Sequence, residues 1–81
     1  MHVTYERCCG IDVHKETVVA CVIVPGSDGQ PVKVTRTFRT MTSELKALAQ
    51  WLVAQGVTHV AMESTGVYWI APFEVLERYG F

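Results

Sequence analysis

The pattern of apolar and polar positions predicts three strands in the first half of the chain. Residues 6 to 13 and 17 to 24 are dense in valine, isoleucine and cysteine, which predicts two strands buried on both faces and joined by the polar connection HKET. The turn residues of PGSDGQP, 25 to 31, come next, and residues 32 to 39 alternate apolar with polar residues, as a half-exposed strand does. Short turns between consecutive strands predict an antiparallel meander.

The period of the pattern then changes to that of a helix. In TSELKALAQWLVAQG, which begins at residue 42, apolar residues recur at helical spacing and Gly56 can end the helix. Residues 57 to 64 read as a fourth strand, and the helix before it allows a right-handed crossover that places it parallel to an earlier strand. A second helix is predicted from residue 67 to residue 79. Its expected buried stripe consists of Trp69, Phe73 and Leu76.

The predicted order is therefore strand, strand, strand, helix, strand, helix. A meander whose first strand is joined on its free side by a parallel fourth strand opens the ribonuclease H-like fold, an α/β fold. The actin-like ATPase and sugar-kinase fold is the rival, since it also opens with three strands and an aspartate in the first. That rival needs glycines after the aspartate, as in D-x-G-x-T, whereas Val13, His14 and Lys15 follow Asp12.

Composition limits the chain to one domain without signals for export. Its 81 residues are 49% hydrophobic and 19% charged, which provides a core, and no apolar run approaches the length of a membrane span. The start MHVTYERCCG lacks the regions of a signal peptide, so we expect a cytoplasmic protein. The three cysteines lack the CxxC spacing of zinc sites, so we expect reduced thiols.

Charge is distributed unevenly along the sequence. The net charge of −1 does not indicate a nucleic-acid-binding protein. Residues 33 to 46, however, set four basic residues against Glu44 alone, namely Lys33, Arg36, Arg39 and Lys46. Lys33, Arg36 and Arg39 are therefore candidate nucleic-acid contacts, with a solvated strand edge as the alternative.

A carboxylate interrupts the first apolar strand. Asp12 is costly there unless it has a partner, a metal ion or a position at the wet end of the strand. If the first and fourth strands are parallel neighbours, Asp12 and Glu63 lie side by side at one sheet edge, on strands about 4.8 Å apart. Oxygen ligands of this kind select Mg²⁺ or Mn²⁺, ions that support in-line attack at phosphorus. The sequence thus predicts a metal pair, with a turn former and a surface acid as the alternative.

Polar and aromatic residues follow each of these acids. His14 and Lys15 can face phosphate, although a polar turn between strands needs such residues in any case. Ser64 and Thr65 can bind an anion at a helix N-terminus or cap the second helix, and capping is the simpler interpretation. Tyr68 and Trp69 can stack on bases, although an aromatic pair at a helix start usually packs in a core.

Two segments of the chain resemble a known family. GIDVHKETVVACVI together with AMESTGVYWIAPFEVLE closely resembles the N-terminal part of bacterial transposases of the insertion-sequence one-ten family, whose catalytic domain is similar to the Holliday-junction resolvase RuvC. In that family a tetrad of Asp, Glu, Asp and Asp, abbreviated DEDD, binds divalent metal ions. Asp12 and Glu63 match its first two members, and the last two have no counterpart here. Residues 1 to 81 are thus expected to be a RuvC-like domain truncated at its C-terminal end.

The resemblance also implies a function and partners. The chain would be the N-terminal fragment of a DNA transposase or recombinase that acts with Mg²⁺ or Mn²⁺ during transposition of an insertion sequence. DNA is the implied partner, a guide RNA is a further one, and the full-length protein would form a homo-oligomer without contact with a membrane. With half of the tetrad missing, we expect no activity from the chain alone. The alternative is an inactive fragment that only binds nucleic acid or the full-length recombinase.

Overall fold

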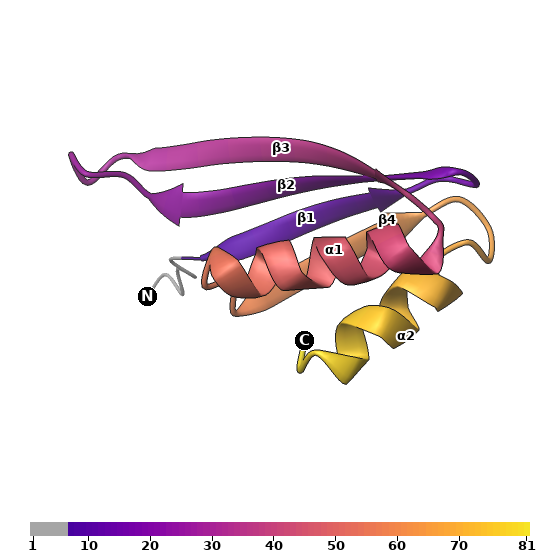
Figure 1. Cartoon of the computed structure of the whole chain (residues 1–81). Coiled ribbons are helices and arrows are strands. Elements are labelled where there is room, and N and C mark those ends of the chain that lie inside the picture. The colour runs from indigo at the N-terminus through magenta and orange to yellow at the C-terminus, as the bar shows by residue number, and fades with distance from the viewer. Residues whose placement is uncertain (1–6) are drawn as a thin grey trace, which may run out of the picture.

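The elements of the chain follow the predicted order (Figure 1). A computed structural model describes residues 7–81, and the expected start of the first strand at residue 6 lies outside the described residues. The strands and helices are β1 Cys8–Val13, β2 Thr17–Pro25, β3 Pro31–Arg39, α1 Thr42–Ala54, β4 His59–Ser64 and α2 Ile70–Arg78. The prediction of an α/β chain with the order β-β-β-α-β-α is confirmed.

The four strands form one mixed sheet in the order β3-β2-β1-β4. β1 pairs with β2, and β2 with β3, in antiparallel fashion, which is the predicted meander. β4 pairs with β1 in parallel after the crossover through α1. The C-terminal ends of β1, β3 and β4 consequently lie at the same edge of the sheet (Figure 1).

Within residues 7–81 the helices cover one face of the sheet, because both lie on the same side of it (Figure 1). In β1 the side chains of Cys9, Ile11 and Val13 are buried under the helices, whereas Gly10 and Asp12, which alternate with them, are exposed. The prediction that the first two strands are buried on both faces is therefore wrong. We call the uncovered side, which carries Asp12, the open face.

Helix α1 supplies most of the cover. Its leucines Leu45, Leu48 and Leu52 are at most 1% exposed and pack on the sheet, as their helical spacing predicts. The helix ends where Gly56 adopts a φ of 70°, a left-handed conformation that suits glycine. Between residues 7 and 81 neither helix is long and apolar enough to cross a membrane.

Helix α2 begins later than predicted, at Ile70 rather than at residue 67. A turn precedes it, in which Gly66 has a φ of 62°, and its N-cap residue is Trp69, which makes no side-chain cap hydrogen bond. The interpretation of Ser64 and Thr65 as caps is therefore wrong, because several residues of turn separate them from the helix.

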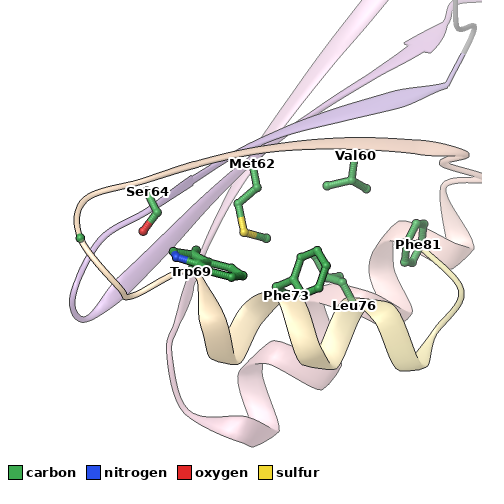
Figure 2. A pocket seen from close by; sticks show the side chains of 8 residues that line it. Val60, Met62, Ser64, Trp69, Phe73, Leu76 and Phe81 are labelled. Atoms are coloured by element: carbon green, nitrogen blue, oxygen red, sulfur yellow. The ribbon is translucent and has the colours of Figure 1, made fainter.

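A groove separates α2 from the edge strand β4 (Figure 2). α2 packs on α1 and buries Pro72, Val75 and Leu76. Phe73 and Leu76 of α2, with Trp69 just before the helix, line a space of about 580 Å³ between α2 and β4. Trp69 and Phe73 meet edge to face at 5.6 Å there, yet they are 42% and 47% exposed. The predicted buried stripe is thus correct for Leu76 and wrong for these two aromatic residues.

Candidate functional site

Asp12 and Glu63 are register partners in the parallel pair of β1 and β4. Each is the penultimate residue of its strand, and both are exposed on the open face. Parallel neighbours in a sheet lie about 4.8 Å apart, so the two carboxylates can reach one cation. The structure brings these strand positions together as predicted, and their role as metal ligands stays a prediction.

A small cavity lies between the ends of β1 and β4. Its volume is about 150 Å³, and it is lined by Asp12, Val13, His14, Glu63, Ser64 and Thr65. The N–H of Thr65 donates to the carbonyl oxygen of Val13 at 3.3 Å, and the Ser64 hydroxyl donates to the carbonyl oxygen of Thr65 at 3.3 Å. The first bond holds the chain after β4 against the end of β1, beside the two acids, and the second is local to that segment.

The donor chemistry at this edge fits a hydrated divalent ion. Mg²⁺ is commonly bound through one or two carboxylates and keeps several water ligands, which is what Asp12 and Glu63 can offer. Within the described part of the chain, no group of three or more His, Cys, Asp or Glu residues is arranged to hold a metal ion. Two carboxylates without a third protein ligand of this kind predict weak binding.

The turn between β1 and β2 presents His14 and Lys15 at the same edge. The N–H of His14 donates to the carbonyl oxygen of Thr17 at 2.8 Å and closes the turn. Thr40 fixes the turn from outside, since its hydroxyl donates to the carbonyl oxygen of Lys15 at 3.3 Å and its N–H to that of Glu16 at 3.2 Å. Both predicted side chains are therefore exposed on an anchored backbone next to Asp12.

A larger cavity of about 360 Å³ adjoins this turn. Lys15 and Tyr68 line it together with Thr40 and Glu74, which the sequence did not single out. Thr40 could have been found from its position directly after β3, because β3 ends at the same edge of the sheet as β1. Nothing in the sequence pointed to Glu74, because an acid on an exposed helix face is unremarkable without the neighbouring turn in view.

The three predicted basic contacts do not form one patch. Arg39 ends β3 at the edge where β1 ends, whereas Lys33 pairs with Ile23 at the opposite end of the sheet. Arg36 lies on the helix-covered side, with its guanidinium carbon 5.0 Å from the ring centre of Phe38 and 5.1 Å from that of Trp51. Of the three, only Arg39 lies near the carboxylate edge.

The cysteines are placed for packing rather than for chemistry. Cys9 is buried, and Cys8 and Cys21 are half-buried, all as free thiols. Burial, reinforced by the neighbouring thiols of Cys21 and Cys8, raises the pKa of Cys9 from 9.0 to about 12. The Cys9 thiol thus stays protonated at neutral pH and is not the thiolate that a metal ion or a redox reaction needs.

Solved structures similar to this chain include two of the Ppx/GppA family from Aquifex aeolicus, each with a TM-score of 0.55 and 18% sequence identity. The matches cover 89% and 90% of this chain but only 30% and 31% of theirs, so the chain spans less than a third of their length. At this identity the likeness shows the fold alone. The likeness does not separate the ribonuclease H-like fold from its rival.

No curated protein sequence matches the chain. A family does match it: residues 9–81 fit the DEDD transposase family of the IS110 type, described as transposase. The match spans both segments on which the resemblance rested, and it includes Asp12 and Glu63. The chain therefore belongs to the IS110 family of transposases, as a part of the N-terminal region of such a protein.

Proposed function

We propose that the chain is the first part of a RuvC-like, ribonuclease H-like catalytic domain that acts on DNA with Mg²⁺ or Mn²⁺ during transposition. The observation that carries this proposal is the parallel register of β1 and β4, which sets Asp12 beside Glu63 on an accessible face. Membership of a transposase family supports DNA as the proposed substrate.

The chain's own residues would bind and orient the ion and the DNA backbone. Asp12 and Glu63 would hold the ion, which when bound supplies positive charge to a phosphate oxygen and lowers the pKa of its water. Lys15 and His14 extend from the adjoining turn, where a cationic side chain can hold a neighbouring phosphate. The open face beside them carries no helix from residues 7–81, which leaves room for a duplex (Figure 1).

The residues after Asp12 favour nucleic acid over a nucleotide as substrate. A phosphate cradle needs glycines so that backbone N–H groups can approach the phosphates closely. Here Val13 is buried in the core, and His14 and Lys15 place side chains where such a cradle would have to form. This local chemistry supports the ribonuclease H-like assignment over the actin-like one.

The partners that we propose follow from the family. DNA is the substrate, and a guide RNA directs the protein to it. The full-length protein assembles as a homo-oligomer that works with DNA in the cytoplasm. Ser64, Thr65 and Tyr68 extend the candidate nucleic-acid surface from the end of β4.

A second candidate function is binding without chemistry. Among the described residues no group of three or more His, Cys, Asp or Glu side chains is arranged to hold a metal ion, whereas a two-ion mechanism needs more ligands than two carboxylates. The isolated chain would then bind nucleic acid or the full-length recombinase and leave DNA intact.

Titration calorimetry with Mg²⁺ and Mn²⁺ tests the metal site. We expect weak binding that disappears when Asp12→Ala and Glu63→Gln are combined, and tight binding that survives both changes would place the site elsewhere. Incubation of the chain with Mn²⁺ and branched or linear DNA tests the second candidate. Intact DNA is expected, and cleavage that Asp12→Asn abolishes would show that the chain is catalytic by itself.

A further inference from the structure

The cavity beside the β1–β2 turn combines a cation, an aromatic ring and a carboxylate. Lys15 lies three residues after Asp12, and Tyr68 lies five residues after Glu63, so both extend from the loops that carry the acids. Glu74 reaches the same cavity from α2. A phosphate, a flat base and an amino group are the ligand features that match these three side chains.

We propose that this cavity binds one unstacked nucleotide of the DNA whose backbone lies at Asp12 and Glu63, an inference that rests on the proposed function. Tyr68 stacks on the base, Lys15 contacts the phosphate, and Glu74 accepts a hydrogen bond from an exocyclic amino group of the base. The site would therefore hold a base next to the phosphate that is brought to the carboxylate pair.

The size of the cavity suits a single nucleotide. Its volume of about 360 Å³ is near the lower end of the roughly 300–1,000 Å³ typical of small-molecule sites. Val67, Ile70 and Pro72 give it an apolar wall, and Tyr68, which is 41% exposed, offers a ring that is not already used in the core. A base that enters the cavity would leave its stack with the neighbouring bases of the DNA and stack on the ring of Tyr68 instead.

The walls of the cavity are anchored rather than loose. The Thr40 hydroxyl holds the backbone of Lys15 at 3.3 Å, and the N–H of Ile70 donates to the carbonyl oxygen of Val67 at 3.3 Å. Pro72 is buried in the packing of α2 against α1. The cation and the ring are therefore mounted on chain segments with fixed positions, so that binding orders few residues.

Glu74 gives the site a preference among bases. An ionised carboxylate only accepts hydrogen bonds, and acidic side chains accept readily from the amino group of cytosine. Thymine presents two carbonyl oxygens beside its single N–H, and a carboxylate repels both. Cytosine is therefore preferred over thymine. Replacing Glu74 with glutamine adds a donor, which removes this discrimination while keeping the size of the side chain.

Fluorescence anisotropy of labelled single strands tests the proposal with the whole chain in EDTA, so that no metal ion contributes. Strands of equal length carry cytosine, thymine or abasic sites. Tyr68→Leu should weaken binding of the cytosine strand roughly 5- to 100-fold, whereas Tyr68→Phe keeps the ring and should bind within about threefold of the wild type. Glu74→Gln should bring cytosine and thymine strands to similar affinity, and Lys15→Gln should reduce the salt dependence of binding.

The outcomes separate this inference from the proposed function. Equal binding of abasic and cytosine strands, or no effect of Tyr68→Leu, would overturn the base site while DNA remains a ligand. Failure to bind any strand would overturn it as well. A chain that binds bases as expected but shows no Asp12-dependent metal binding would contradict the metal site alone. Circular dichroism of each variant confirms folding, which substitutions at exposed positions leave intact.

Discussion

Replacing Asp12 with asparagine should stabilise the metal-free chain. Asp12 and Glu63 are register partners on neighbouring strands, so their side chains extend on the same face from backbones roughly 5 Å apart, and we take this spacing for the charges in the calculation. Two like charges at that distance in water repel by about 0.8 kcal/mol, and about 0.1 M salt reduces this to about 0.5 kcal/mol. For a chain of this size the change raises the melting temperature by about 2–4 °C.

A divalent ion should make the wild type melt at a higher temperature than Asp12→Asn, which reverses the order expected in EDTA. At ten times the Kd, a ligand that binds only the folded state stabilises it by about 1.4 kcal/mol, and only the wild type would gain this in full. Melting curves by circular dichroism, recorded with EDTA and then with increasing Mg²⁺, measure both effects. Glu16→Gln is the matched control, because it removes the same charge from an exposed position at the same sheet edge without touching the pair.

Two results would refute the reasoning. If Asp12→Asn melts no higher than the wild type in EDTA while Glu16→Gln behaves in the same way, the two carboxylates do not face each other. If Mg²⁺ stabilises the wild type and Asp12→Asn equally, the ion binds elsewhere on the chain. Either outcome concerns the metal site directly and does not depend on any catalytic assay.

Two further predictions concern the core and the groove. Because burial raises the pKa of Cys9 to about 12, the unfolded chain loses this proton from about pH 9 while the folded chain keeps it, so stability falls between pH 9 and 12. The free energy of unfolding falls by about 1.4 kcal/mol at pH 10. Denaturant melts at pH 8 and pH 10 should show a smaller decrease in this free energy for Cys9→Ala than for the wild type. An equal decrease in the two proteins would contradict the role of Cys9. The exposed aromatic groove lies beside the edge of β4 that pairs with no other strand of residues 7–81 and should make the chain self-associate, so Phe73→Ser should shift sedimentation toward the monomer. Val53→Ser, at an exposed position of α1, should leave association unchanged, and a wild type that is monomeric at micromolar concentration would exclude the groove as an interface.

The juxtaposition of Asp12 and Glu63 could be predicted from sequence because it depends only on strand order. Once a helix separates the fourth strand from a meander, the crossover rule makes that strand parallel, and parallel strands align their C-terminal ends. Asp12 and Glu63 then pair directly in register because each lies one residue before the end of its strand. Local patterns were enough for this part of the site.

The open face and the second cavity could not be predicted in this way. Whether a strand is covered on one face or two depends on where both helices dock, and apolar density in β1 and β2 carries no information on that. Because side chains alternate along β3, Arg36 lies on one face of the sheet and Lys33 and Arg39 lie on the other. Only the position of α1 shows that the face with Arg36 is the one that the helices cover. Glu74 lines the same cavity as Lys15, a placement that depends on how α2 packs on α1.

The parallel pairing of β1 with β4 also orders events during folding. β1, β2 and β3 pair through short turns, so their contacts form after the closure of small loops. β4 joins β1 only after β2, β3 and α1 have been traversed, and nonlocal parallel pairing is intrinsically slow. A growing chain therefore completes its meander well before Glu63 reaches Asp12. If the proposed metal site is correct, we expect the capacity to bind a divalent ion to appear in the last stage of folding, after β4 has paired with β1.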